Sequence, residues 1–446
     1  MHALSAVCAG AGSVRQLRRL RRMPLMSMRQ WMRRFIFWLG AVLVGVAAIS
    51  FAGLADQASD LFLAMVAGRP WVPFLLAPAG LGFSVFLTRK VFPGAQGSGI
   101  PQVIAALHMA RPERIEAMLS PRIAIGKVVL TLLGLGCGAS IGREGPTVQV
   151  SATIMHVLGR VLRLPRVEAQ RALVLAGGAA GVAAAFNTPL AGVVFAIEEL
   201  SHSFEARTSG TVLTAVIIAG ITTMGLLGNY TYFGTASAQL DFGSGWVAVL
   251  ACGVCGGLAG GSFSALLLRF AQGLPGLVGR WIAHHPILFA TLCGLLIAIV
   301  GWIGKGSTYG TGYAQARMLV VGRDNLPPLF FVLKFIASVL SYVSGIPGGI
   351  FAPSLAVGAG LGHTIAHVLP QAPAGAVVLL GMVAYFSGVV QAPITAVIIV
   401  MEMTDDQRVT IPLMATAVLA YGVSRLICRR PLYATLAKRF LLPSEH

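Results

Sequence analysis

The chain has few charged residues for its length. Asp, Glu, Lys and Arg make up 11% of its 446 residues, whereas a soluble domain carries about 25%, so the soluble globular class is excluded. Sparse charge together with 56% apolar residues also excludes an intrinsically disordered chain. Six cysteines are too few for a disulfide scaffold of this size. The remaining class is an all-α integral membrane protein that crosses the bilayer several times.

Acidic residues are fewer than basic ones: the chain has 15 Asp and Glu and 33 Lys and Arg. The basic surplus is concentrated at the two ends, with arginines before residue 35 and both Lys and Arg after residue 424. Because Lys- and Arg-rich flanks stay in the cytoplasm, we expect both termini there and an even number of crossings. Nucleic-acid binding is the rival interpretation of so basic a chain. It is disfavoured because the basic residues flank apolar runs and not a polar domain.

The apolar runs predict two membrane repeats between short polar ends. We expect a basic cytoplasmic tail at 1–34, a first repeat at 35–228, a second at 229–428 and a cytoplasmic segment at 429–446. Several runs, among them 171–197 and 375–401, are interrupted by Gly and Pro. Broken helices at membrane depth are tolerated where their backbone lines a cavity or is covered by protein. The breaks are therefore the candidate sites.

Three breaks combine glycine and proline most densely. They are Gly97-Ser98-Gly99-Ile100-Pro101, Gly142-Arg143-Glu144-Gly145-Pro146 and Gly349-Ile350-Phe351-Ala352-Pro353. Each is followed by an apolar run, and proline is well tolerated in the first turn of a helix. Each break therefore predicts the start of a helix.

The second and third breaks also belong to an internal repeat. Phe186-Asn187-Thr188-Pro189-Leu190 resembles Val390-Gln391-Ala392-Pro393-Ile394 at nearly the spacing that separates those two breaks, and each proline precedes a glutamate by nine residues. Paired broken segments in two halves of a membrane protein indicate a repeat transporter fold with its site at the repeat interface.

Helix starts at membrane depth favour an anion as ligand. A helix N-terminus carries unpaired N–H groups and about half a positive charge. Removing the water of a small ion costs roughly tens of kcal/mol in a dry medium, so several termini and hydroxyl donors must converge. Ser98 and Tyr433 are the candidate hydroxyls.

A few charged residues lie in or against the apolar runs, namely Glu144, Glu198, Glu199, Glu402, Lys127, Arg143 and Lys334. Such residues are functional candidates by default because they are costly to insert. The lysines would attract anions to the interior. The alternative is that they reach the membrane surface or pair with the buried glutamates.

The three breaks, in this order and with Tyr433 after them, resemble the selectivity filter and tyrosine of the CLC chloride channel and transporter family. The resemblance spans roughly residues 70 to 440. It implies a CLC-type fold with two inverted-topology repeats of tilted, partly broken helices, and a homodimer with one ion pathway per subunit. It also implies that Ser98, Tyr433 and the backbone amides of Ile350 and Phe351 hold the central chloride.

The resemblance further assigns the glutamates. Glu144 matches the external gate, where a carboxylate competes with the anion until it is protonated. Glu199 matches the internal proton-transfer glutamate of the proton-coupled members, which favours a chloride/proton antiporter. A voltage- or pH-gated chloride channel remains the alternative because it would share every anion-binding residue. Glu198 is adjacent to Glu199, and neighbouring residues of a helix point in different directions, so we expect at most one of the two to face the pathway. The alternative is that both acids are solvated at a helix end. Glu402 is interpreted as structural.

Other functional classes have weak support. Ser98 between glycines could suggest an intramembrane hydrolase, but no histidine base is expected at its depth, so we predict no enzyme activity, and neither cofactor nor metal. The chain stops at His446, and we therefore expect no cytoplasmic nucleotide-binding domains and a prokaryotic inner-membrane protein.

Overall fold

The computed structural model describes residues 28–109, 112–161, 167–201, 206–228, 232–234, 240, 243, 245–323, 326–404 and 408–441. Most of the predicted basic tail, and residues 442–446 of the predicted C-terminal segment, lie outside the described residues.

The described residues form a bundle of helices. Those of the first half are α2 (Met28–Val66), α3 (Val72–Lys90), α4 (Ile100–His108), α5 (Pro112–Met118), α6 (Pro121–Gly136), α7 (Glu144–Val161), α8 (Val167–Phe186), α9 (Pro189–Phe195), the π-helix η2 (Ala196–Ser201) and α10 (Ala206–Leu227). Those of the second half are α11 (Gly245–Gln272), α12 (Gly276–His284), α13 (Pro286–Ile303), α14 (Tyr313–Val320), α15 (Phe330–Val343), α16 (Phe351–Val368), α17 (Ala374–Val390), α18 (Pro393–Thr404), α19 (Thr410–Ile427) and α20 (Leu432–Leu441).

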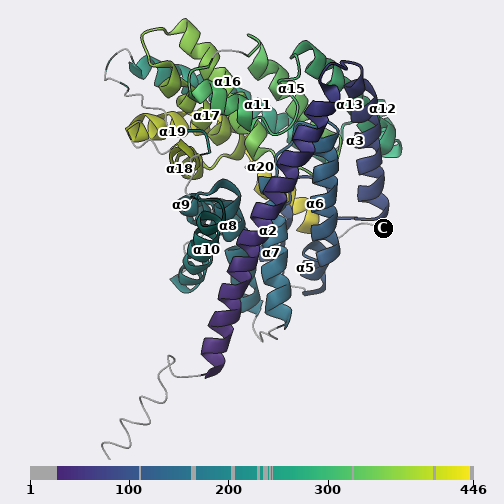
Figure 1. Cartoon of the computed structure of the whole chain (residues 1–446), viewed down its shortest axis with the longest axis vertical. Coiled ribbons are helices and arrows are strands. Elements are labelled where there is room, and N and C mark those ends of the chain that lie inside the picture. Colours follow the sequence, from purple (N-terminus) through teal and green to yellow (C-terminus); the bar gives the residue numbers. More distant parts are fainter. Residues whose placement is uncertain are drawn as a thin grey trace, which may run out of the picture.

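The bundle has an apolar outer surface as well as an apolar core. Among the described residues, seven helices are long and apolar enough to cross a membrane, and many large apolar side chains on them are exposed, such as Leu61, Phe83 and Leu292. The long helix α2 runs across the whole molecule in Figure 1 and packs against α6, α7, α8 and α10. In contrast, α17 is buried along nearly its whole length. An apolar exterior around a buried centre fits a polytopic membrane protein, as the composition predicts.

Two of the predicted apolar runs each span two helices. Run 171–197 contains most of α8 and all of α9, and run 375–401 contains most of α17 and most of α18. The breaks fall at Asn187 and Gln391, both with the left-handed backbone that ends a helix (φ 56° and 62°). Pro189 and Pro393 then begin the next helix in each half. The two members of the predicted repeat therefore share their backbone conformation as well as their residue types.

The repeat is also visible in helix packing. Helix α7 packs along α8, and α16 packs along α17. Glycine permits both contacts: a Cβ at Gly177 would lie 2.7 Å from the Ser151 carbonyl oxygen, and one at Gly358 would lie 2.7 Å from the Gly381 carbonyl oxygen. Small residues at a membrane helix interface let the two backbones approach closely.

Candidate anion site

The three glycine-rich breaks meet in the centre of the molecule. The Gly142 amide donates to the Gly349 carbonyl oxygen and the Gly349 amide donates back to Gly142, both at 2.7 Å. The Gly348 amide donates to the Gly97 carbonyl oxygen at 3.1 Å. The pairing of Gly142 with Gly349 is antiparallel, so these two segments run in opposite directions where they meet. Helices α4, α7 and α16 all begin within a few residues of this junction.

The predicted anion donors lie beside the junction. Ser98 and Tyr433 are 1% and 0% exposed, and their hydroxyl groups have no ordinary hydrogen-bond partner among the described residues. The Tyr433 hydroxyl lies close to the Ser98 hydroxyl and within electrostatic range of Glu144 and Glu199. Tyr433 is in the first turn of α20, which packs against α4. Buried hydroxyl groups without partners are costly, so this pair is suited to receive an anion.

Backbone amides complete the donor set. Ile350 precedes α16 and Phe351 begins it, so their N–H groups belong to the four that a helix leaves without an internal acceptor. Both residues are buried. The Phe351 ring packs 6.0 Å from the Tyr433 ring, centroid to centroid. This contact places the start of α16 next to the tyrosine.

Two glycines make room for Ser98. A Cβ at Gly145 would lie 2.2 Å from the Ser98 Oγ, and one at Gly99 would lie 2.9 Å from the Gly145 carbonyl oxygen. Gly99 also has a φ of 102°, which side-chain-bearing residues rarely adopt. Ser98, Gly99 and Gly145 therefore interlock, whereas Ile100, Pro101 and Pro146 lie buried in the first turns of α4 and α7.

Glu144 places its carboxylate at the start of the opposite repeat. The side chain is 0% exposed, Oε1 accepts a hydrogen bond from the Tyr313 hydroxyl at 2.6 Å, and Oε2 accepts one from the Ala352 amide at 3.4 Å. Ala352 and Pro353 lie in the first turn of α16. The carboxylate thus occupies a position where an anion would be stabilised by the helix terminus.

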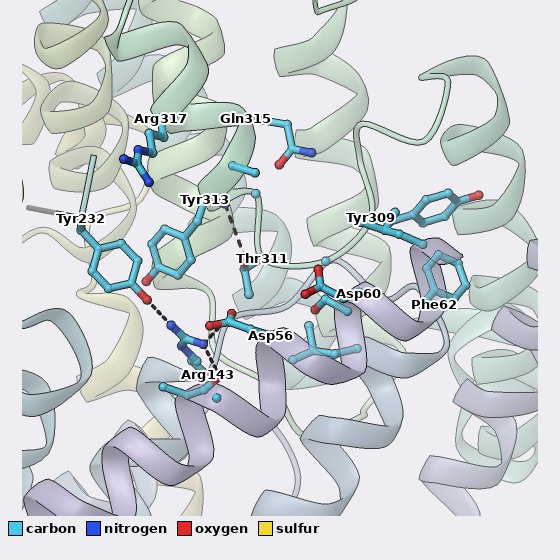
Figure 2. A pocket seen from close by; sticks show the side chains of 18 of the residues that line it. Asp56, Asp60, Phe62, Arg143, Tyr232, Tyr309, Thr311, Tyr313, Gln315 and Arg317 are labelled. Carbon is cyan, nitrogen blue, oxygen red and sulfur yellow. Dashed lines mark hydrogen bonds and ion pairs between the residues drawn. The ribbon is translucent and has the colours of Figure 1, made fainter. Parts of the chain in front are cut away.

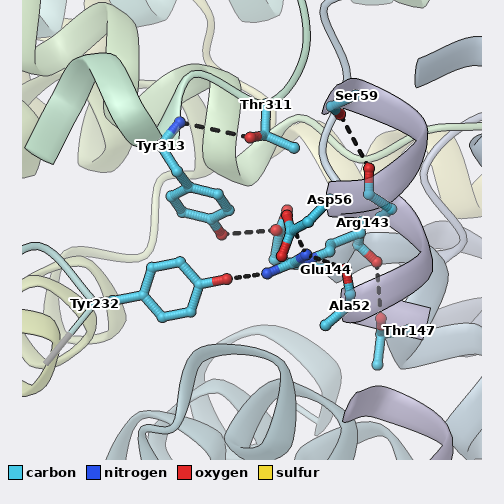
Figure 3. Close-up of polar contacts among 10 residues, drawn as sticks. Ala52, Asp56, Ser59, Arg143, Glu144, Thr147, Tyr232, Thr311 and Tyr313 are labelled. Carbon is cyan, nitrogen blue, oxygen red and sulfur yellow. Dashed lines mark hydrogen bonds and ion pairs between the residues drawn. The ribbon is translucent and has the colours of Figure 1, made fainter. Parts of the chain in front are cut away.

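Arg143 belongs to an ion-pair and hydrogen-bond network with Asp56 and Tyr232 (Figures 2 and 3). Its Nη1 donates to Asp56 Oδ1 at 2.7 Å and to the Ala52 carbonyl oxygen at 2.5 Å, and its Nη2 donates to the Tyr232 hydroxyl. Arg143 is 4% exposed. The guanidinium is therefore committed to fixing the loop between α6 and α7 against α2.

Two separate cavities reach the site. One, of about 680 Å³, is lined by Asp56, Arg143, Tyr232 and Tyr313 among others (Figure 2). The second, of about 450 Å³, is lined by Ser98, Pro101, Tyr342 and Arg439 among others. The two cavities share no lining residue. Ser98 therefore lies at the smaller cavity, whereas Tyr313 and Arg143 lie at the larger one.

The neighbouring glutamates Glu198 and Glu199 have different surroundings. Glu198 accepts bonds from the Ile394 amide at 3.2 Å and from the Thr395 amide and hydroxyl at 2.6 and 2.7 Å, so it caps the start of α18. Glu199 is 2% exposed, and its Oε1 has no partner among the described residues. Glu199 is therefore the carboxylate of the two that remains available for proton exchange.

Glu402 mirrors Glu198. Its two carboxylate oxygens accept bonds from the Leu190 amide at 3.1 Å and the Ala191 amide at 2.7 Å, which caps the start of α9. Each repeat therefore caps the broken helix of the other, and this geometry is in accord with the structural interpretation of Glu402.

Loss of the cap at α9 should lower stability. We expect Glu402→Ala to destabilise the protein by about 1 kcal/mol, the usual effect of removing a helix cap, because two amides of α9 lose their acceptor. Thermal unfolding in detergent would measure the change. Asp60→Ala is the matched control, since Asp60 is an exposed acid on α2. Equal stability of the two variants would contradict the capping role.

The two buried lysines bind backbone carbonyl groups. Lys127 Nζ donates to the carbonyl oxygens of Gln96 and Gly97 at 3.2 and 2.9 Å. Lys334 Nζ donates to those of Thr308 and Gly310 at 2.9 and 2.7 Å. Both are 0% exposed, so the alternative that they reach the membrane surface is wrong. Each lysine instead fixes the loop that precedes a helix start, before α4 in one case and before α14 in the other.

One helix start at the site was not predicted from the sequence. Gly310-Thr311-Gly312 precedes α14, and Gly312 has a φ of 87°, just as Gly97-Ser98-Gly99 precedes α4. The shared Gly-x-Gly pattern could have indicated this helix start. The break contains no proline, so it was not among the predicted starts. This fourth start supplies Tyr313, the partner of Glu144.

Comparison with known proteins gives consistent matches. Residues 79–425 match the family model described as "Voltage gated chloride channel". Proteins named H(+)/Cl(-) exchange transporter ClcA, from Yersinia pseudotuberculosis (serotype IB, strain PB1/+) and Yersinia pestis, are 32% identical over 426 residues, which is 90% of this chain and 86% of theirs.

Solved structures give the same result for the fold. A slow cyanobacterial Cl-/H+ antiporter superposes with a TM-score of 0.78 at 25% identity, covering 92% of this chain and 99% of that one. A CLC-type fluoride/proton antiporter superposes with a TM-score of 0.74 at 24% identity, covering 89% of this chain and 96% of that one.

Proposed function

The chain belongs to the voltage gated chloride channel family, and from this premise we propose that it is a secondary transporter that exchanges chloride for protons across a membrane. The observation that carries the proposal is the position of the Glu144 carboxylate at the start of α16. An ionised carboxylate there excludes a second anion by charge and by volume. Protonation of Glu144 removes the negative charge and weakens the interaction of the carboxyl group with the helix terminus. Chloride binding and protonation of Glu144 are therefore coupled.

The donors around the junction would hold the chloride. Ser98 and Tyr433 contribute buried hydroxyl groups without other partners, and the amides of Ile350 and Phe351 contribute the partial positive charge of α16. Together they replace part of the ion's water. The remaining filter residues, Gly97, Gly99, Gly142, Gly145 and Gly349, let these backbones approach one another.

Glu199 would carry the proton on the inner side. It is buried, one of its oxygens has no partner, and it lies within electrostatic range of Tyr433. In this proposal a proton passes between Glu144 and Glu199 on a route separate from the second cavity, whose lining residues do not include Glu199. Arg439 lines that cavity next to Ser98, where its positive charge would attract chloride to the entrance.

The arrangement in the membrane follows from the charge distribution. We propose repeats at 35–228 and 229–428, both termini in the cytoplasm and an inner-membrane location, supported by the basic residues that flank the first and last apolar runs. A homodimer is the assembly implied by membership in the family. Cross-linking of purified protein in detergent would test the dimer.

A reversal-potential measurement separates the antiporter from the channel alternative. Protein reconstituted into liposomes under fixed chloride and proton gradients should give a reversal potential that shifts when the pH gradient alone is changed, because each turnover moves both ions. Protein-free liposomes are the control. A potential that follows chloride and ignores pH would overturn the antiporter proposal in favour of a channel.

A further inference from the structure

Tyr313 is held in place by its backbone and by its neighbours. It begins α14 directly after Gly312, and Lys334 fixes the preceding loop through the carbonyl oxygens of Thr308 and Gly310. The Tyr313 amide donates to the Thr311 hydroxyl at 3.5 Å. The phenol therefore extends from a fixed helix start.

The Tyr313 ring is packed on several sides. Its centroid lies 4.6 Å from that of Tyr232 and 5.7 Å from that of Phe233. The Arg143 guanidinium lies 5.8 Å from the Tyr313 ring centroid, within the range of a cation–π interaction. Figure 3 shows the resulting geometry, in which the phenol points at Glu144 and the guanidinium points at Tyr232 and Asp56.

The ring also separates the gate from the larger cavity. Tyr313 and Arg143 line that cavity, whereas Glu144 is not among the described residues that line it and is 0% exposed. A carboxylate that moves toward this cavity must break its bond with the Tyr313 hydroxyl.

We propose that Tyr313 is the positioning residue of the gate: its hydroxyl holds the ionised Glu144 carboxylate at the start of α16 and so sets the pH at which exchange begins. The inference rests on the proposed exchange of chloride for protons. A phenol donates more strongly to a carboxylate than to a neutral carboxyl group. The hydrogen bond therefore stabilises the closed, ionised gate more than the protonated one, and it delays opening until the pH is lower.

Other charged and titratable groups lie near this pair. Those that line the larger cavity together with Tyr313 are Arg143, Asp56 and Asp60 on α2, Tyr232 before α11 and Arg317 on α14. Lys334 on α15 lies beside Gly312, and Tyr433 on α20 lies within electrostatic range of Glu144. Arg143 is paired with Asp56, and Lys334 with backbone carbonyl groups. A change of Tyr313 to phenylalanine retains all of them and the ring packing, so the variant isolates the hydroxyl.

The test is the pH profile of exchange in liposomes. Tyr313→Phe should raise the pH of half-maximal chloride/proton exchange by about one unit, the expected effect of losing one hydrogen bond to a charged group, with the number of protons moved per chloride unchanged. Tyr232→Phe is the matched control, because the Tyr232 hydroxyl accepts a hydrogen bond from Arg143, whereas the Tyr313 hydroxyl donates one to Glu144. Its midpoint should equal that of the unmodified protein.

Three results would overturn the inference. They are an unmoved midpoint in Tyr313→Phe, an equal shift in Tyr232→Phe, and a pH dependence of chloride flux in Glu144→Ala that Tyr313→Phe still alters. If the unmodified protein moves no protons with chloride, the proposed function fails, and the inference fails with it. If exchange is intact and the midpoint does not move, only the role of Tyr313 is lost.

Discussion

Replacing Glu144 by alanine should abolish proton transport while chloride continues to cross. In the proposed exchange, this carboxylate both carries the proton and occupies the start of α16, where it accepts a hydrogen bond from the Ala352 amide. Without it, the anion position stays open at every pH, and the acid proposed to pass the proton to the anion position is lost. We expect proton flux to fall by roughly 100-fold or more, as is usual when a proton-transfer group is lost, and chloride flux to lose its dependence on pH.

Simultaneous chloride and pH electrodes outside chloride-loaded liposomes would measure both fluxes. Asp60→Ala is the matched control, since Asp60 lines the same cavity without contacting the gate, and it should retain coupled exchange. Proton flux that persists in Glu144→Ala would remove Glu144 from the role of gate, whatever the effect on chloride.

Replacing Glu199 by glutamine should also stop proton movement, but for a different reason. The amide is nearly isosteric with the carboxyl group and so preserves the packing of this buried side chain, yet it cannot accept and release a proton. The gate at Glu144 remains intact. We therefore expect chloride flux to continue with its pH dependence, while proton flux falls by roughly 100-fold or more.

Glu198→Gln is the internal control for this result. Glu198 is the adjacent acid, but its carboxylate caps α18 through Ile394 and Thr395. This variant should keep its proton coupling and lose stability instead, by about 1 kcal/mol. If Glu198→Gln stopped proton flux and Glu199→Gln did not, the two roles would have to be exchanged.

The reciprocal capping explains why two adjacent acids can differ so much. Glu198 and Glu402 occupy equivalent points of the two repeats, and each binds the amides of the helix that begins in the other half. These bonds tie α9 to α18. Glu199 makes no such capping bond among the described residues. The π-helical turn that contains both acids directs the Glu199 side chain into the buried interior. Such turns occur frequently at functional sites.

Three helix starts at the site could be predicted from residue types alone. The glycine- and proline-rich breaks that begin at Gly97, Gly142 and Gly349 predict these starts. The structure confirms that helices begin at Ile100, Glu144 and Phe351. The roles of Ser98, Tyr433, Glu144 and Glu199 in transport stay predictions, for which the experiments above are designed.

Some errors in the predicted helices have a local cause. Hydropathy averages over many residues, so it joined α8 to α9 and α17 to α18 across Asn187 and Gln391, where a single left-handed residue followed by a proline ends one helix and begins another. Hydropathy also does not predict α14, because this helix has only eight residues and contains Gln315 and Arg317. Its start lacks a proline as well, so Tyr313 was not predicted as a site residue.

The sequence by itself determined the membrane class, the paired breaks of the two halves, the helix starts at Ile100, Glu144 and Phe351, and the family, because each depends on residues that are adjacent or regularly spaced along the chain. Tertiary structure alone decided which groups meet: the junction of Gly97, Gly142 and Gly349, the position of Glu144 at α16, and the contact of Tyr313 with its carboxylate. These contacts join segments that are far apart in sequence and depend on distances of a few ångströms. Residue types can specify a hydrogen-bond donor or acceptor, but the packing of the two repeats selects its partner.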